Sequence, residues 1–211
     1  MNTFIIGANG RVASALIDRL VAQGHHVTAG LRDTSKLPDQ SRVTKVTFDL
    51  HASVDAMSQE LKGADVVYFL AGSRGKDLLQ TDAFGAVKAM QAAQKAGIKR
   101  FIMLSALLST EPEKWEAAGV NQLADYYVAK FFADHYLMTS TQLDYTILQP
   151  GALVEEPATG KVDLSSSQVA SIAIEDVAAV LAELPAASNT IGKEIPLVQG
   201  NQDIASAIKA V

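Results

Sequence analysis

Short runs of branched and aromatic residues alternate with longer segments of helical period along nearly the whole chain. The runs Val66-Val67-Tyr68-Phe69-Leu70 and Phe101-Ile102-Met103-Leu104 are apolar at every position. A strand that is apolar on both faces has to be buried between two layers of helices. Because helical crossovers between parallel strands are right-handed, the alternation predicts an α/β fold with a doubly wound parallel sheet in a single domain, residues 1–211.

The expected elements follow from the period of the apolar residues. We expect seven strands, at residues 3–6, 26–31, 43–48, 65–70, 99–104, 143–148 and 194–198, and helices at 11–23, 52–62, 81–97, about 121–138, 174–184 and 202–210. Gly24, Gly63 and Gly97 stand where helix C-caps are expected. The stretches 106–120 and 151–172 break the alternation, and long irregular segments in a compact domain are often binding loops. We therefore expect both to be substrate loops.

Charge and residue usage limit the partners. Eighteen basic and 23 acidic residues give a net charge of −5, without a basic run, so nucleic acid is not an expected partner. No segment approaches the ~18 apolar residues of a membrane span, and the amino terminus lacks a basic leader. The absence of cysteine excludes disulfides and thiolate chemistry, and we expect a cytoplasmic protein. The four histidines have no ligand spacing, so no metal site is expected.

A glycine-rich turn follows the first expected strand directly. It consists of Gly7, Ala8, Asn9, Gly10, Arg11 and Val12, with the spacing Gly-x-x-Gly-x-x-Ala completed by Ala13. Glycines let a backbone approach a pyrophosphate closely, and the free amides at a helix start attract its charge. An ordinary glycine turn is the alternative, but the position between the first strand and the first helix favours a dinucleotide-binding loop.

The residues at the ends of two further expected strands indicate which cofactor binds. Arg32 and Asp33 follow the second strand. An arginine there matches the 2′-phosphate of NADP, whereas an acid would accept hydrogen bonds from the ribose of NAD. Arg32 favours NADP with NAD as the alternative, unless Asp33 only caps the next turn; Lys36 offers a second phosphate contact. Asp49 and Leu50 end the third strand, where an adenine would lie, although Asp49 is equally explained as a cap.

Several motifs together resemble one family. They are the glycine turn, Ala71-Gly72-Ser73 after the fourth strand, Ser105 at the end of the fifth, Tyr126-Tyr127-Val128-Ala129-Lys130, and the run from Leu143 to Pro150-Gly151. This combination resembles the atypical short-chain dehydrogenase/reductases, above all the bacterial oxidoreductases of the YlbE type and the NmrA-like proteins. The resemblance implies a Rossmann-type fold that binds NAD(P), with Ala71, Gly72, Ser73, Lys130, Pro150 and Gly151 contributing to the cofactor site.

Tyr126 and Lys130 are four residues apart, so on a helix they share one face. A neighbouring ammonium favours the ionised form of a phenol. The resemblance implies that Tyr126 exchanges a proton with the substrate oxygen while Lys130 also holds the nicotinamide ribose. Tyr127 is the alternative if the helix is rotated, and Asp134 is an alternative ion-pair partner for Lys130.

The resemblance also implies that Ser105 orients the substrate. Ala106 follows it where relatives often have another serine, and Ser109 is a weaker substitute. Gln149 stands where relatives commonly have arginine, which argues against a phosphate clamped beside the site. The loop from Gly72 to Lys76 offers positive charge instead, although a solvated basic loop explains it equally.

We therefore expect an NADP-preferring oxidoreductase that transfers a hydride between the nicotinamide and a small carbonyl, quinone or similar substrate, with Tyr126, Lys130 and Ser105 as catalytic residues. One alternative is a flavin or quinone reductase that needs no tyrosine acid. Another is a non-catalytic NADP-binding redox sensor of the NmrA-like type. Ala106 and Gln149 depart from the residues that relatives have at these positions, so the redox sensor stays an alternative.

Overall fold

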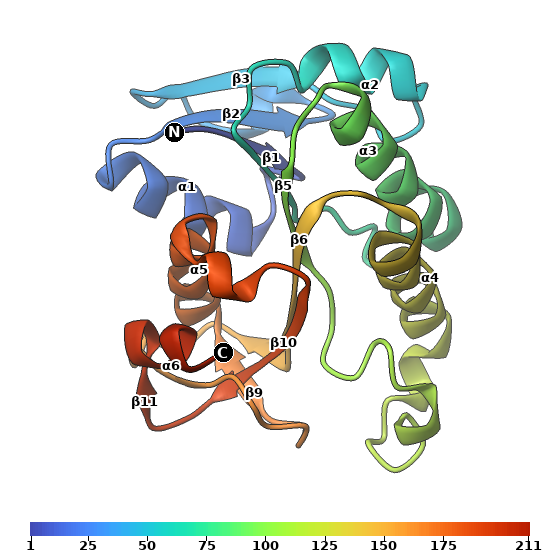
Figure 1. The fold of residues 1–211 in the computed structure, drawn as a ribbon, viewed down its shortest axis with the longest axis vertical. Coiled ribbons are helices and arrows are strands. Elements are labelled where there is room, and N and C mark those ends of the chain that lie inside the picture. Colours follow the sequence, from blue (N-terminus) through green and yellow to red (C-terminus); the bar gives the residue numbers. More distant parts are fainter.

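The computed structural model describes residues 1–211 and contains all seven expected strands. They form one parallel sheet in the order β3-β2-β1-β4-β5-β6-β10 (Figure 1). Their bounds are β1 Asn2–Ile6, β2 His26–Leu31, β3 Val43–Thr47, β4 Val66–Phe69, β5 Arg100–Leu104, β6 Asp144–Pro150 and β10 Lys193–Gln199. The order changes direction at β1, which puts the carboxyl ends of β1 and β4 side by side at a topological switch point.

The sheet is larger than the expected seven strands. Two short strands, β8 (Lys161–Asp163) and β11 (Gln202–Asp203), extend it antiparallel beyond β10 to nine strands. A separate parallel pair consists of β7 (Ala152–Val154) and β9 (Ser171–Ala173). The stretch 151–172 therefore carries three strands that the sequence did not predict, because strands of two or three residues are too short to show a period.

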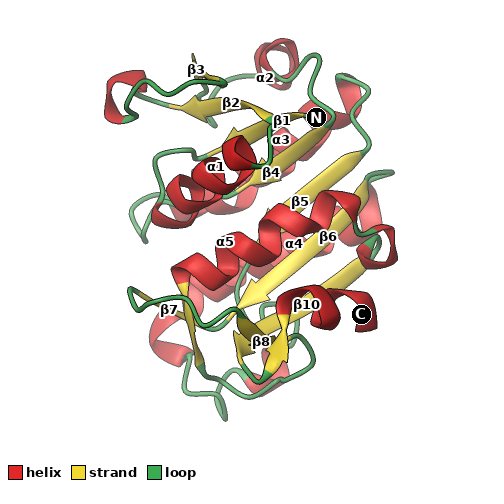
Figure 2. Ribbon diagram, turned by 90° about the vertical axis from the view of Figure 1, so that its left-hand side faces the viewer, coloured by secondary structure: helices red, strands yellow, loops and turns green.

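Helices cover both faces of the sheet. They are α1 Arg11–Ala22, α2 Val54–Glu60, α3 Phe84–Lys95, α4 Ala124–Ser140, α5 Ile174–Glu183 and α6 Ile204–Ala210. Helices α1, α5 and α6 lie on one face of the sheet, and α2, α3 and α4 lie on the other. Figure 2 shows α1 and α5 side by side on their shared face. Helix α3 is shorter than expected at its start, where Leu78–Ala83 forms a π-helical turn.

Side chains of the central strands alternate between two cores. Ile5 and Tyr68 pack toward α1 and α5, whereas Phe4, Ile6 and Phe69 pack toward α2, α3 and α4. All five are at most 1% exposed. This two-sided burial confirms the prediction made from the uniformly apolar strands.

The three expected C-cap glycines have positive φ, +82° at Gly24, +84° at Gly63 and +79° at Gly97, as left-handed caps require. Each ends a helical segment and returns the chain toward a strand of the central sheet. Among the helices of this fold, none combines the length and the hydropathy that crossing a bilayer requires.

Candidate functional site

The glycine turn begins at Gly7, at the carboxyl end of β1. Gly7 has φ +88°, and its N–H donates to the carbonyl of Gly30 at 3.0 Å. A Cβ at Gly7 would lie 2.6 Å from the Cα of Ala71, closer than real side-chain atoms approach. Gly10 precedes the first turn of α1 and offers no side chain that would cap the helix amides. The turn therefore leaves the start of α1 open to an anion.

A cleft of about 470 Å³ opens in front of this turn, along the carboxyl ends of the strands around β1. It is lined by nine of the residues expected to bind the cofactor: Gly7, Asn9, Gly10, Arg32, Asp49, Leu50, Ala71, Gly72 and Ser73. Of the remainder, Ala8 and Val12 have side chains buried in the core, so only their main chain can serve the turn. Arg11 is exposed and pairs with Glu155 at 2.9 Å.

One end of the cleft is basic. Arg32, Lys36, Arg74 and Lys76 all line it. Asp33 caps the following turn, because one oxygen of its carboxylate, Oδ1, accepts hydrogen bonds from the backbone N–H and the hydroxyl of Ser35, at 3.1 and 2.6 Å. These hydrogen bonds also hold the pKa of Asp33 below its ordinary value. The geometry selects the capping alternative for Asp33.

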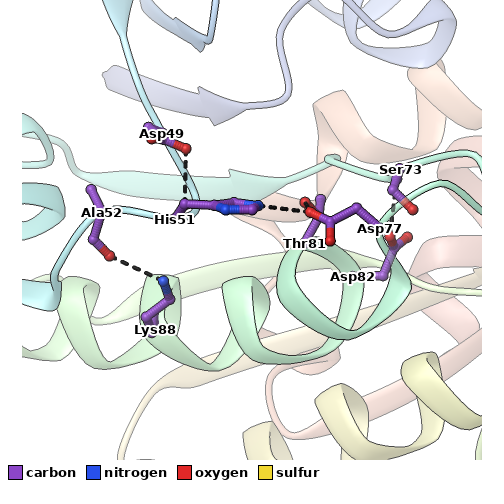
Figure 3. Close-up of polar contacts among 8 residues, drawn as sticks. All are labelled: Asp49, His51, Ala52, Ser73, Asp77, Thr81, Asp82 and Lys88. Carbon is purple, nitrogen blue, oxygen red and sulfur yellow. Dashed lines mark hydrogen bonds and ion pairs between the residues drawn. The ribbon is translucent and has the colours of Figure 1, made fainter.

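Beside Asp49, a side-chain bridge joins two loops that line the cleft. His51 Nε2 lies 2.7 Å from Asp77 Oδ2, to which Thr81 also donates, at 2.6 Å (Figure 3). The hydrogen bonds from Thr81 and His51 lower the pKa of Asp77. Asp49 accepts from the N–H of His51 at 2.9 Å, so it caps this turn while also lining the cleft.

A second hollow of about 320 Å³ adjoins the first and shares Leu70, Ala71 and Gly72 with it. Most of its lining is apolar. Both segments expected to form substrate loops contribute: Ala106, Leu107 and Val120 from one, and Gly151, Ala152, Leu153 and Val169 from the other. Ser105, Tyr126, Lys130, Pro150 and Gly151 line it as well, so the expected catalytic residues all lie at this hollow.

Tyr126 and Lys130 lie on one face of α4, as their spacing predicts. Lys130 is only 3% exposed, donates to the carbonyl of Leu104 at 3.0 Å, and has its Nζ 5.8 Å from the centre of the Tyr126 ring. Tyr127 turns instead toward Trp115, with ring centres 5.4 Å apart. Tyr126 is therefore the more available of the two phenols, although both line the hollow.

Ser105 is held by a buried carboxylate. Its hydroxyl donates to Asp134 Oδ2 at 2.5 Å, and Ser109 donates to the same oxygen at 2.6 Å. Complete burial raises the pKa of Asp134 to about 6, although the two serine hydrogen bonds lower it. Asp134 therefore binds serines and forms no ion pair with Lys130, whose Nζ goes to Leu104.

Gln149 completes this buried network. Its amide donates to Ser109 at 3.0 Å and to Glu194 at 3.1 Å, and it is 5% exposed. A neutral amide therefore serves here as an internal hydrogen-bond donor. No local sequence pattern predicts this network, because its members come from the loop after β5, from α4, from β6 and from β10, and the pairs are separated by 25 to 45 residues.

Asp82 is a further residue that the sequence did not single out. It lies in the π-helical turn before α3, is 0% exposed, and lines the second hollow. The N–H of Ser73 donates to its Oδ2 at 3.0 Å. No pattern in the sequence marks this residue, because its burial depends on the π-helical turn.

Known proteins share this arrangement. The family model described as NAD(P)H-binding matches residues 7–187. The Bacillus subtilis protein YhfK, described as an uncharacterized sugar epimerase, is 36% identical over 217 residues, covering 99% of each chain. The oxidoreductase YlbE from Lactococcus lactis superposes with a TM-score of 0.97 at 44% identity, covering 100% of this chain and 96% of that one.

A short-chain dehydrogenase/reductase from Veillonella parvula in complex with NADP shares the fold, with a TM-score of 0.79 at 19% identity, covering 95% of each chain. The expected similarity to YlbE-type oxidoreductases is thus confirmed. The glycine turn, the cleft along the switch point and the matched family model agree. The chain belongs to the NAD(P)H-binding family of Rossmann-type proteins.

Proposed function

We propose that this protein is an NADP-preferring oxidoreductase of the short-chain dehydrogenase/reductase type that acts on a small carbonyl, quinone or similar compound. The observation that carries the proposal is the junction of two hollows: the dinucleotide cleft continues into an apolar hollow lined by Tyr126 and Lys130. A nicotinamide at this junction would present its ring to a substrate beside the phenol. NADPH, when bound, supplies the hydride.

The residues of the cleft fit such a cofactor. Gly7 allows the tight turn against Ala71 that a Cβ would prevent, and Gly10 leaves the first amides of α1 uncapped for a diphosphate. Arg32 and Lys36 are exposed at the basic end and supply charge for a 2′-phosphate. The carboxylate of Asp33 is occupied by Ser35, which removes the competitor that would favour NAD. This combination favours NADP, with NAD as the alternative.

The chain's own groups perform the proton chemistry in this proposal. Tyr126 donates a proton to the substrate oxygen during reduction and accepts it during oxidation. The ammonium of Lys130 lies 5.8 Å from the centre of the Tyr126 ring, which places a positive charge beside the group that gives up the proton. Because Lys130 uses one hydrogen bond on Leu104, it keeps donors for a ribose hydroxyl.

The test is NADPH oxidation with a panel of aldehydes, ketones and quinones, using Tyr126→Phe and the matched neighbour Tyr127→Phe. We expect Tyr126→Phe to lower kcat by about 10²- to 10⁴-fold, the usual contribution of a general acid. NADPH affinity, measured by calorimetry, should stay within about twofold, since the phenol is not proposed to hold the cofactor. An unchanged rate would remove Tyr126 from the mechanism, and a loss confined to Tyr127→Phe would transfer the role to that residue.

A second candidate, a flavin or quinone reductase without a tyrosine acid, is favoured by one observation. The hydroxyl of Ser105 is committed to Asp134, and most of the surrounding hollow is apolar, as a flat stacking substrate requires. This candidate predicts quinone or flavin reduction that survives Tyr126→Phe. No oxidation of NADPH by any member of the panel would instead support the redox sensor.

A further inference from the structure

Two buried oxygen atoms at the junction of the hollows have no hydrogen-bond partner. They are Asp82 Oδ1 and Ser73 Oγ, each without accessible surface. The other carboxylate oxygen of Asp82 accepts from the Ser73 N–H (Figure 3). Burying an oxygen without a hydrogen-bond partner costs free energy. Native structures therefore rarely contain such an oxygen without a functional reason.

The position of the pair links the two hollows. Ser73 lines the dinucleotide cleft, Asp82 lines the apolar hollow, and Gly72 between them lines both. A Cβ on Gly72 would lie 3.4 Å from Asp82 Oδ1, so the glycine leaves that oxygen without a covering side chain. A ligand that spans the junction therefore passes both residues, and its hydroxyl reaches the two buried oxygens once a small side-chain displacement uncovers them.

The local backbone holds the pair in place. Asp82 lies within a π-helical turn, a rare geometry that is frequent at functional sites. Asp77, which precedes this turn, is fixed by Thr81 and His51. The turn also packs against α4, which carries Tyr126 and Lys130. The free oxygens are thus preorganised beside the proposed reacting groups.

The chemistry of the two atoms defines their ligand. A carboxylate oxygen only accepts hydrogen bonds, whereas a serine hydroxyl also donates. The group that complements both is a hydroxyl. We propose that Asp82 and Ser73 form a recognition site for a hydroxyl group of the bound ligand, supplied by the nicotinamide ribose or by a hydroxyl next to the carbonyl of the substrate. This inference rests on the proposed function for the identity of those two ligands.

The cofactor arm of the test is calorimetric titration of NADPH into the wild type, Asp82→Asn and Ser73→Ala. The matched control is Asp125→Asn, which changes an exposed carboxylate on α4. If the ribose supplies the hydroxyl, we expect Asp82→Asn to weaken NADPH binding by about 10- to 100-fold, because a hydrogen bond to a charged group is lost. Ser73→Ala should weaken it less, and Asp125→Asn should not change it.

The substrate arm compares acetophenone with 2-hydroxyacetophenone, which differ by one hydroxyl. Binding to the free protein and to its NADP complex is measured by ligand-detected NMR, which needs no turnover. If the substrate supplies the hydroxyl, the wild type prefers the hydroxylated ketone by about 10-fold or more, and Asp82→Asn loses that preference while NADPH affinity is unchanged. A protein that takes up no dinucleotide would overturn the proposed function, yet the comparison in the free protein would still test Asp82.

A stability measurement separates recognition from a structural role. In the unliganded protein, Asp82→Asn removes a buried charge that has one partner, so its unfolding midpoint should equal or exceed that of the wild type. A lower midpoint with unchanged NADPH affinity and unchanged ketone preference would mean that Asp82 only supports the loop. Unchanged binding in both arms overturns the proposal whatever the midpoint.

Discussion

Ser105 donates its hydroxyl hydrogen to Asp134, and both side chains are buried, at 4% and 0% exposure. A serine that donates to a carboxylate cannot donate the same hydrogen to a substrate oxygen. For Ser105 to orient a substrate, its hydroxyl has to leave Asp134, or Asp134 has to carry a proton itself. The state of one internal carboxyl group therefore governs what this serine can do.

The protonation of Asp134 predicts a pH dependence of stability. Its pKa is raised to about 6, so the folded state holds this proton more tightly than the unfolded state. The associated stabilisation is complete below the unfolded pKa and is lost as the pH rises through 6. We expect the free energy of unfolding to fall by about 2 kcal/mol from this group between pH 4 and pH 7. Denaturant titrations at several pH values should show a smaller decrease in Asp134→Asn, and parallel profiles for the two proteins would contradict the assignment.

Cofactor preference should depend on Arg32. Removing its guanidinium with Arg32→Ala is expected to weaken NADPH binding by about 10- to 100-fold and to leave NADH binding nearly unchanged, because only NADPH carries the 2′-phosphate. Asp33→Ala should leave NADH binding nearly unchanged, since Asp33 caps the turn at Ser35 and is not proposed to hold the ribose. Lys209→Ala, an exposed change on α6, serves as the control in the same calorimetric titrations. A strong NADPH preference retained by Arg32→Ala would refute the role.

The glycine turn offers a matched pair of substitutions. Gly7→Ala places a Cβ 2.6 Å from the Cα of Ala71, whereas Gly24→Ala has nothing within 4 Å, and both residues have positive φ. Gly24→Ala should cost about 1–2 kcal/mol from left-handed backbone alone. Gly7→Ala should cost more and abolish dinucleotide binding, as measured by thermal unfolding and calorimetry. Equal losses of stability in the two variants would show that the contact with Ala71 does not matter.

Trp115 is expected to hold the loop at 106–120 over the apolar hollow. Its indole N–H donates to the carbonyl of Leu108 at 2.8 Å, and Leu108 has φ +64°, which is strained for a leucine. Trp115→Phe removes that donor, so we expect faster hydrogen exchange in this loop and a higher KM for the substrate, with NADPH affinity unchanged. Phe132→Leu, which alters an exposed ring on α4, should do neither. Equal exchange rates in wild type and Trp115→Phe would contradict the role.

The parts of the fold that the sequence predicts depend on local patterns. The seven long strands appear as apolar runs, and the glycine turn appears because its backbone conformation restricts the residue type at Gly7. Strands β8 and β11 have only three and two residues; β8 pairs with the edge of β10, and β11 pairs in turn with β8. Such pairing depends on tertiary contacts, which local periodicity does not contain.

In the site, too, local patterns were predictable and tertiary contacts were not. Tyr126 and Lys130 were predictable together because one helix carries both. The partners of Ser105 were not, since Asp134 is 29 residues away in sequence and on another element. Asp82 escaped notice because an ordinary α-helix in place of the π-helical turn would orient this position differently.

The two adjoining hollows have only Leu70, Ala71 and Gly72 in common. Substitutions at Val120, Leu153 or Val169 can therefore alter the set of compounds accepted without touching the turn around Gly7. Under the proposed function, changes at Arg32 or Lys36 would likewise switch the nucleotide without altering the substrate repertoire. During divergence of related sequences, or in directed evolution, these two specificities can vary independently of each other.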